Sequence, residues 1–380
     1  WLVLWLCCKP GMASAFASPL LLLLTCPRCW LCFAQDATCS ANGGGNCGDG
    51  LQVPPVIIGC WQLLEKDRNQ NNAVSTLKQY ADAGFTAFDT ADIYGPSERI
   101  LGKFRSQWLQ ANPGKPEPRF FTKYVTDSTT VQEADRINAQ SRGALGVSTL
   151  ELVQFHFWSL DQHGRNRDFV QAGQQLMRLK SAGKVNHVAA CNFDTVNLKH
   201  MVDDGVAIEA NQVQYSLLDR RPEARLLSYC KEKNIKLLVF GVVGGGLLSD
   251  SFLGLSSSAA QRKLDSVSRQ MYFSSLQAWT RGDWGLFQSL LQTLRAVADR
   301  HAGATVAHVA SQWTLRRLSD LGAGGGLIIG VRDAGHLDEH TRLLRGDDPL
   351  TDDDMKQIQV VLDKGAQPAG DIWDRERGWA

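Results

Sequence analysis

A regular alternation of strand-like and helix-like segments restricts the fold of this chain more than any other feature. Short runs rich in β-branched and aromatic residues alternate with longer segments that have the i, i+3, i+4 apolar spacing of half-buried helices. Strand, helix and strand in this order pair in parallel through right-handed crossovers, and eight such units close into a barrel. The sequence therefore predicts an α/β protein with the (β/α)8 TIM barrel fold. The expected strands lie near 55–60, 86–90, 119–125, 150–157, 185–192, 208–214, 236–242 and 326–331.

The chain divides into three regions of different composition. Residues 1–50 form a leader and a Gly-rich linker, which we expect to be disordered. Residues 51–345 form the barrel, and their number is in the range of a single barrel domain, which typically has about 250 residues or more. Residues 346–380 form a tail that we expect to pack on the barrel.

The leader has the composition of a targeting segment. Met12 is followed by small and polar residues, by a run of leucines, and by the small-residue, cleavage-like sequence Cys32-Phe-Ala. If residues 12–34 are a transit segment, we expect an organelle such as the plastid; otherwise we expect the cytoplasm, and a secretory signal peptide is the alternative. The apolar run is too short and too interrupted by prolines to span a bilayer. We therefore expect no stable membrane insertion.

Charge and cysteine content exclude several classes of protein. The net charge of +1 gives no electrostatic reason for binding to nucleic acid. Seven of the ten cysteines precede Gln52, and the three in the barrel region give no disulfide framework. Cys26, Cys29 and Cys32 have the spacing of an iron–sulfur run, but no further ligand follows at a suitable spacing and the run lies in the leader. We therefore expect no metal site.

Polar residues at the ends of strand-like runs are the main candidates for chemistry. They are Asp89 and Tyr94 in the segment Phe88–Glu98, Lys123 after Phe-Phe-Thr, and His156 after Leu-Val-Gln-Phe. The active site of a (β/α)8 barrel is built at such strand ends. A tyrosine with a pKa near ~10 is a poor acid at neutral pH, and a neighbouring ammonium lowers that pKa. A carboxylate can hold the ammonium in place, and an imidazole can orient the acceptor of the proton.

At these residues the chain resembles the aldo-keto reductase superfamily. The resemblance runs from about Val53 to about His340, and five further segments match the family's strands in order. They are Val53–Trp61 for the first strand, Gly183–Phe193 for the fifth, Asn211–Ser216 for the sixth, Leu237–Leu248 for the seventh with its loop, and Ile328–Arg332 for the eighth. The resemblance implies an NADP-dependent oxidoreductase that reduces an aldehyde or ketone to an alcohol, or catalyses the reverse reaction, on a small-molecule carbonyl substrate.

The resemblance also gives each of the four polar residues a role. Tyr94 would protonate the carbonyl oxygen as hydride arrives at the carbon, assisted by Lys123, Asp89 and His156. Asp92 could compete with Asp89 for Lys123, but the family's motif assigns this role to the first aspartate.

The expected cofactor is NADP(H), and its contacts carry over residue by residue from the family. Asn192 and Gln212 would bind the carboxamide, and Phe240 would stack on the nicotinamide ring. The loop after strand seven would bind the pyrophosphate through backbone N–H groups. The full set of expected cofactor residues is Cys191, Asn192, Gln212, Phe240, Gly241, Gly246, Leu247, Ser249, Gly330, Arg332, His336 and His340. Trp61 and Trp158 would form walls of the substrate pocket.

The sequence departs from the family pattern after strand eight. His336 occupies a position where many members have an arginine that contacts the 2′-phosphate, and His340 occupies one where many have an asparagine. A neutral imidazole is a weaker partner for a phosphate than a guanidinium, so the expected preference for NADPH depends on Arg332. The segment from Ser249 to Leu286 is expected to be an insertion that covers the cofactor.

Two other functions remain open from the sequence. The chain could be a nicotinamide-binding regulatory subunit resembling the potassium-channel beta subunits, which share this barrel and the four polar residues. It could also be a barrel lyase or isomerase that uses Lys123 to form a Schiff base, although the spacing of Asp89 and Tyr94 argues against this. The sequence identifies neither the physiological substrate nor the oligomeric state.

Overall fold

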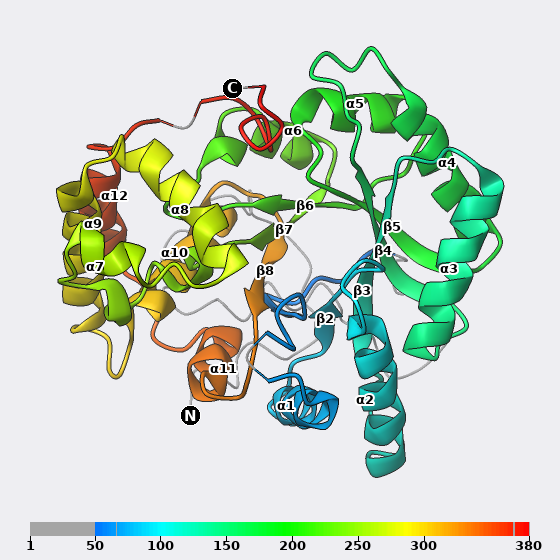
Figure 1. The fold of residues 1–380 in the computed structure, drawn as a ribbon, viewed down its shortest axis with the longest axis horizontal. Helices are drawn as coiled ribbons and strands as arrows, with labels where there is room; N and C mark the ends of the chain where they lie inside the picture. Colours follow the sequence, from blue (N-terminus) through cyan, green and yellow to red (C-terminus); the bar gives the residue numbers. More distant parts are fainter. Residues whose placement is uncertain (1–49, 66, 368, 380) are drawn as a thin grey trace, which may run out of the picture. The chain divides into compact units, whose positions relative to one another are not determined.

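A closed parallel barrel forms the centre of the fold. The computed structural model describes residues 50–65, 67–367 and 369–379. Each strand pairs in parallel with the next, and β8 pairs with β1 to close the barrel (Figure 1). The strands are β1 (Val56–Gly59), β2 (Ala87–Asp89), β3 (Arg119–Thr126), β4 (Leu150–Phe157), β5 (Val185–Cys191), β6 (Ala210–Gln214), β7 (Lys236–Phe240) and β8 (Gly325–Gly330). The (β/α)8 fold predicted from the sequence is confirmed.

Helices follow the strands around the barrel. Those after β1 to β6 are α1 (Gln70–Asp82), α2 (Ser97–Ala111), α3 (Val131–Leu145), α4 (Asp168–Ser181), α5 (Thr195–Asp203), the short η3 (Arg221–Glu223) and α6 (Leu226–Glu232). Those after β7 are η4 (Gly244–Gly246), η5 (Asp250–Phe252), α7 (Ser257–Gln261), α8 (Val267–Thr280), α9 (Trp284–Ala298) and α10 (Val306–Asp320); α11 (Leu337–Arg345) and α12 (Asp352–Leu362) follow β8. In Figure 1, α7, α8, α9 and α12 lie together on one side of the barrel.

Helix α3 illustrates how the local sequence determines an element. The helix begins after Thr130, whose hydroxyl accepts a hydrogen bond from the backbone N–H of Glu133. It ends at Gly146, whose φ of 69° is left-handed and costs little for a residue without a Cβ atom. The buried face follows the i, i+3, i+4 pattern, with Ala134, Ile137, Asn138, Ser141 and Leu145.

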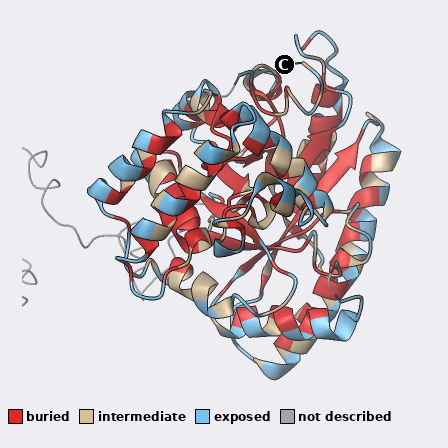
Figure 2. Cartoon of the chain, turned by 60° about the vertical axis from the view of Figure 1, so that its left-hand side comes forward, coloured by how far each residue is buried: buried red, intermediate tan, exposed pale blue. Residues whose placement is uncertain are grey.

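The side chains inside the barrel form layers that determine where a site can lie. The lower layer is an apolar, buried cluster with one residue from each strand: Ile57, Ala87, Phe121, Leu152, Ala189, Ala210, Leu238 and Ile328. Side chains alternate between the two faces of a strand, so the residue two positions later points inward again. That second layer consists of Gly59, Asp89, Lys123, Gln154, Cys191, Gln212, Phe240 and Gly330. Polar side chains of the second layer therefore lie above the apolar lower layer. The strands that carry both layers are mostly buried (Figure 2).

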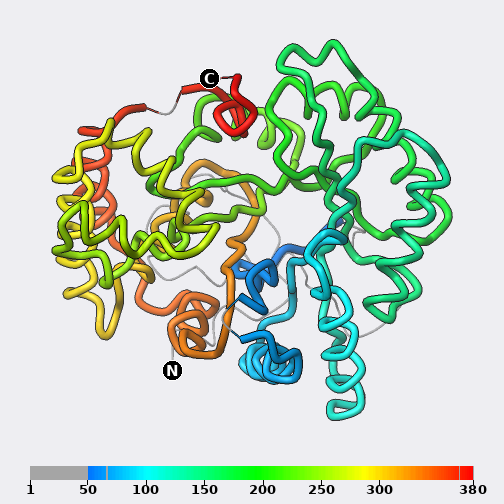
Figure 3. Tube along the Cα trace, in the orientation of Figure 1, coloured from blue at the N-terminus to red at the C-terminus, as the bar shows by residue number. Residues whose placement is uncertain are grey.

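The last described segment returns to the barrel after α12. In Figure 3 the C-terminal turn, drawn in red, lies beside the green tube that carries β6 and α6. An ion pair between Arg221 and Glu376 joins the same two regions. Trp373 and Trp379 are partly buried and pack against the main hydrophobic core.

Several expectations fall on residues 1–49, which lie outside the described residues. They concern nearly all of the leader and linker, the possible targeting segment over residues 12–34, and the run of three cysteines. In the part of the chain that is described, no helix is both long and apolar enough to cross a membrane. Within the same residues, no cluster of His, Cys, Asp and Glu side chains could hold a metal ion.

A buried histidine on α10 makes the stability of the fold depend on pH. His308 is 2% exposed, and neither of its ring nitrogens has a hydrogen-bond partner. Burial lowers the pKa of His308 to about 4. An unfolded histidine has a pKa of about 6.5. Between about pH 4 and pH 6.5, therefore, His308 binds a proton in the unfolded chain but not in the folded chain. The free energy of unfolding therefore falls as the pH drops from about 6.5 towards 4.

We predict that His308→Leu removes part of this acid sensitivity. At pH 5 the variant should regain about 2 kcal/mol of the free energy of unfolding that the wild type loses between pH 7 and pH 5. Urea unfolding at both pH values measures the difference. His163→Leu changes an exposed histidine and is the matched control. If the wild type and His308→Leu lose the same free energy of unfolding between pH 7 and pH 5, His308 is not the source of the acid sensitivity.

Candidate active site

A buried ion pair between neighbouring strands lies at the centre of the site. Lys123 Nζ donates a hydrogen bond to Asp89 Oδ1 at 2.8 Å and another to the backbone oxygen of Thr90 at 2.9 Å. Asp89 is 3% exposed and Lys123 is 4% exposed. Burial alone would lower the pKa of Lys123, but the Asp89 carboxylate raises it above its usual value. Lys123 therefore carries a fixed positive charge at neutral pH.

Gln154 is a member of this site that was not predicted from the sequence. Its Nε2 atom donates to Asp89 Oδ2 at 2.7 Å, and Gln212 Nε2 donates to the same oxygen at 2.7 Å. Gln212 Nε2 also lies 2.5 Å from Gln154 Oε1. Its position in the sequence could have indicated this role. Gln154 precedes His156 by two residues and so shares its face of β4. The two amides hold the carboxylate oxygen that Lys123 does not reach.

The phenol ring of Tyr94 lies against the Lys123 charge. Lys123 Nζ is 4.8 Å from the centroid of the ring. Burial raises the pKa of Tyr94 to about 12, although the Lys123 ammonium acts in the opposite direction. The expected lowering by Lys123 is therefore present, but burial outweighs it. At neutral pH Tyr94 holds its proton.

His156 presents one unpaired nitrogen to the site. Its Nδ1 atom lies 3.1 Å from the backbone oxygen of Cys191, and because a carbonyl oxygen only accepts, Nδ1 carries the hydrogen. Burial lowers the pKa of His156 to about 4, so the ring is neutral at pH 7. Its Nε2 atom is buried, has no partner, and is an acceptor in this tautomer.

Asp92 does not take the place of Asp89. Its Oδ2 atom accepts a hydrogen bond from the backbone N–H of Val125 at 3.2 Å, and its Oδ1 atom is buried without a partner. Burial raises the pKa of Asp92 to about 7. Lys123 pairs with Asp89, the first aspartate of the segment.

The expected cofactor residues at the ends of β5 to β7 surround the same site. Asn192 has a left-handed φ of 59°, which asparagine tolerates better than most residues, and its Oδ1 atom is buried without a partner. Cys191 Sγ lies 3.9 Å from Gln212 Oε1. Phe240 is partly buried above the apolar floor. Among the loop residues, Gly241 and Gly246 both have positive φ values, and Leu247 is buried.

Helix α8 packs directly on the glycine loop after β7. A Cβ atom on Gly241 would lie 2.5 Å from the Tyr272 ring, and one on Gly245 would lie 2.8 Å from Ser268 Oγ. The side chain of Ser249 donates to the backbone oxygen of Gly246 at 2.7 Å. The segment expected to be an insertion thus forms η5, α7, α8 and the start of α9.

The expected cofactor residues after β8 lie in different environments. Arg332 Nη1 is 3.7 Å from Glu65 Oε2, and the Arg332 side chain is 42% exposed. His336 is exposed. His340 Nδ1 lies 2.9 Å from the hydroxyl oxygen of Tyr80, and burial lowers the pKa of His340 to about 4. Of these three, Arg332 is therefore the residue that offers a permanent positive charge.

Aromatic side chains lie beside Tyr94 and His156. The rings of Trp61 and Tyr94 are 6.4 Å apart, and Trp158 packs edge-to-face on His156 at 4.6 Å. Trp61 and Trp158 are 45% and 52% exposed. The ring of Trp373, from the C-terminal segment, has its centroid 5.6 Å from that of the His156 ring. Partly exposed indole rings thus lie beside the Tyr94 and His156 side chains.

Known proteins resemble this chain in sequence and in fold. Residues 55–363 match the sequence profile of the Aldo/keto reductase family. The chain is 26% identical over 330 residues to the chloroplastic pyridoxal reductase of Arabidopsis thaliana, an alignment that covers 82% of this chain and 84% of that protein.

Two solved structures share the fold. The glycerol dehydrogenase from Gluconobacter oxydans superposes with a TM-score of 0.65 at 20% identity, covering 85% of this chain and 98% of that one. An aldo/keto reductase from Klebsiella pneumoniae, in complex with NADP and acetate, superposes with a TM-score of 0.62 at 18% identity, covering 84% of this chain and 95% of that one.

We predict that Gln154→Leu lowers the free energy of unfolding by about 1.5–3 kcal/mol, the usual value of a hydrogen bond to a charged group. Gln214→Leu is the matched control, because Gln214 is also buried but donates to the neutral hydroxyl of Ser275. Gln214→Leu should lower the free energy of unfolding by about 0.5–1.5 kcal/mol. Urea unfolding of both variants measures the two costs. If both variants lose the same free energy of unfolding, Gln154 does not stabilise Asp89.

Proposed function

The chain belongs to the aldo/keto reductase family, and we propose that it uses NADPH to reduce an aldehyde or ketone to an alcohol. The observation that carries the proposal is the contact of Tyr94 with Lys123, which is itself fixed by Asp89. A protonated phenol lies against a buried cation, and the buried Nε2 atom of His156 has no partner. This arrangement suits donation of one proton to a carbonyl oxygen.

Tyr94 is the proposed proton donor. Its raised pKa keeps the phenol protonated before reaction. The Lys123 charge stabilises the phenolate that remains after proton transfer, because the two groups are close and little water screens them. Asp89 holds Lys123 in position, and Gln154 and Gln212 hold Asp89. Gln154 and Gln212 thus support Asp89, Asp89 supports Lys123, and Lys123 acts on Tyr94.

His156 is proposed to orient the reacting oxygen. With the hydrogen on Nδ1, Nε2 can accept a hydrogen bond from the Tyr94 hydroxyl or from the hydroxyl of the alcohol product. The low pKa of His156 keeps this acceptor available at neutral pH. Trp61 and Trp158 would exclude water from the pocket and contact the apolar part of the substrate.

The unpaired groups of the site fit a nicotinamide cofactor. Asn192 Oδ1 is a buried acceptor without a partner, which suits the N–H groups of a carboxamide. Phe240 offers a ring face for the nicotinamide, and the glycines of the loop after β7 allow close approach of a pyrophosphate. When bound, NADPH would supply the hydride. Gln212, which now donates to Asp89 and Gln154, would have to share its amide with the carboxamide.

We predict that Tyr94→Phe lowers turnover of 4-nitrobenzaldehyde by about 100- to 10,000-fold, the usual contribution of a general acid. The variant should still quench NADPH fluorescence on binding, because the residues proposed to contact the cofactor are unchanged. Steady-state kinetics and a fluorescence titration measure the two effects. If Tyr94→Phe keeps its turnover, the proton comes from another group. If the wild type reduces none of a broad set of aldehydes and ketones, the proposed function is wrong.

We further predict that the chain binds NADPH more tightly than NADH through Arg332. A guanidinium on the 2′-phosphate should give a difference of about 10- to 100-fold in dissociation constant. Arg332→Met should remove that difference and leave NADH binding unchanged, as measured by fluorescence titration. Arg345→Met, at the exposed end of α11, is the control. Equal affinities of the wild type for both cofactors would exclude this role.

A further inference from the structure

The segment that carries Tyr94 follows the shortest strand of the barrel. Strand β2 ends at Asp89, which pairs with Phe121 of β3, but β3 continues to Thr126. Within the described residues, the last part of β3 therefore has no strand partner on the β2 side. Residues 90–96 pass this part of β3 as a turn before α2 begins. The contacts between this turn and β3 therefore determine where the Tyr94 phenol lies.

The turn is attached to alternate residues of β3. The backbone N–H of Thr90 donates a hydrogen bond to the backbone oxygen of Phe121 at 2.9 Å, and Lys123 Nζ donates to the backbone oxygen of Thr90 at 2.9 Å. Two residues further along β3, the backbone N–H of Val125 donates to Asp92 Oδ2 at 3.2 Å. The Asp92 carboxyl thus satisfies a backbone N–H that a neighbouring strand would otherwise satisfy.

Apolar packing contributes little to the position of this turn. Ile93 is 53% exposed, and Gly95 is exposed with a left-handed φ of 58°. Within the turn, the backbone N–H of Tyr94 donates to the backbone oxygen of Ala91 at 3.1 Å, so Asp92 lies inside the turn that ends at Tyr94. The hydrogen bond to Asp92 therefore restrains the position of Tyr94.

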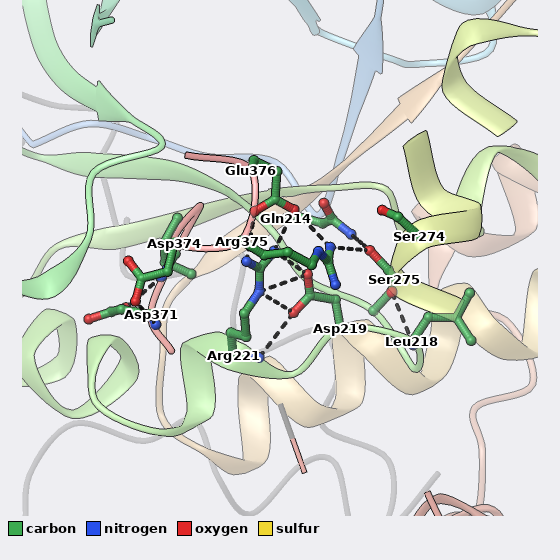
Figure 4. A network of polar contacts seen from close by, with 12 residues as sticks. Gln214, Leu218, Asp219, Arg221, Ser274, Ser275, Asp371, Asp374, Arg375 and Glu376 are labelled. Atoms are coloured by element: carbon green, nitrogen blue, oxygen red, sulfur yellow. Dashed lines mark hydrogen bonds and ion pairs between the residues drawn. The ribbon is translucent and has the colours of Figure 1, made fainter. Parts of the chain in front are cut away.

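The C-terminal tail is attached to the barrel by a larger polar network (Figure 4). Arg221 is buried and pairs with Asp219 at 2.6 Å and with Glu376 at 2.8 Å. Arg375 donates to the hydroxyl of Ser275 on α8 at 2.8 Å. Loss of one of these contacts leaves the others in place. The middle of the turn before α2 has no comparable network among the described residues, so the loss of its carboxyl contact should displace the turn.

The Asp92 carboxyl can accept this hydrogen bond in either protonation state. Its Oδ1 atom is buried without a partner, and burial raises the pKa of Asp92 to about 7. Glu98 on α2 also raises this pKa, whereas Lys123 lowers it. When the carboxyl is protonated, one oxygen carries the hydrogen and the other can still accept from Val125. The attachment of the turn therefore does not require a charge on Asp92.

We propose that Asp92 is a positioning residue for proton transfer, whose carboxyl holds the Tyr94 phenol beside Lys123 through the hydrogen bond with Val125. This inference rests on the proposed function, whose site it extends. Lys123 Nζ lies 4.8 Å from the centroid of the Tyr94 ring, and it can stabilise a phenolate only while the ring stays close. The two aspartates of the segment thus have different tasks. Asp89 fixes the ammonium group, and Asp92 fixes the phenol.

Two substitutions that remove the same charge test this proposal. Asp92→Asn keeps a side-chain oxygen that can accept from Val125, and Asp92→Ala does not. Asp92→Ala should lower kcat for 4-nitrobenzaldehyde by about 100-fold, the usual effect of a displacement of about 1 Å, with little change in KM. Asp92→Asn should keep most of the wild-type kcat. If Asp92→Ala does not fold, Asp92→Glu replaces it, because it keeps the charge but moves the carboxyl, and its kcat should lie below that of Asp92→Asn.

A second aspartate provides the matched control. Asp283, on the exposed turn before α9, accepts a hydrogen bond from the backbone N–H of Leu286 at 3.2 Å, the same length as the bond between Val125 and Asp92. Asp283→Ala should lower the free energy of unfolding without lowering kcat. If Asp92→Asn is as slow as Asp92→Ala, or if Asp283→Ala lowers kcat as much as Asp92→Ala, Asp92 does not position Tyr94 and the proposal is wrong.

A titration of the phenol separates this proposal from the proposed function. With 3-fluorotyrosine in place of Tyr94, fluorine NMR follows the pKa of the phenol without any substrate. Lys123→Met should raise this pKa, because the neighbouring ammonium is lost. The pKa should also be higher in Asp92→Ala than in Asp92→Asn, because both lack the charge and only the asparagine keeps the ring beside Lys123.

The two outcomes of this titration are independent of turnover. Equal pKa values of the fluorinated phenol in Asp92→Ala and Asp92→Asn would contradict the positioning role, even in a protein that reduces aldehydes. A higher pKa in Asp92→Ala, in a protein that reduces no carbonyl compound, would support the positioning role and contradict the reductase.

Discussion

The buried ion pair between Asp89 and Lys123 is the interaction on which the rest of the site depends. Removing two charges from water is costly, and the pair persists only because further hydrogen bonds satisfy both partners. Here Thr90, Gln154 and Gln212 supply those bonds. Below them lies the apolar, buried layer of the barrel, which excludes water. The closed sheet thus places a fixed positive charge where its field is weakly screened.

The same burial sets the protonation states of the groups that would react. It raises the pKa of Tyr94 and lowers that of His156, so both are neutral at pH 7. Lys123 is the exception, because Asp89 compensates its charge. A site with one permanent cation, one phenol and one neutral imidazole can donate a proton and stabilise the anion left behind. None of these three groups would have to change its charge before a substrate binds.

Local sequence was sufficient to predict the barrel, because the alternation of strands and helices is a local property. It was also sufficient to select four polar residues near strand ends as candidates. The structure pairs Lys123 with Asp89 and places Lys123 Nζ 4.8 Å from the centroid of the Tyr94 ring. The role of Gln154 was missed, since its partner Asp89 lies 65 residues away and the contact depends on strand register. The sequence indicated that the tail would return to the barrel but not which of its side chains reaches the site.

The two parts of the site depend on different parts of the chain. Asp89, Lys123 and Gln154 lie on strands, whose positions are determined by the barrel ladder and by the packed layer beneath them. The aromatic rim and the tail instead lie on loops, and the tail is held by the Arg221–Glu376 pair. Changes in the loops can therefore alter which molecules enter while the buried Asp89–Lys123 pair stays in place.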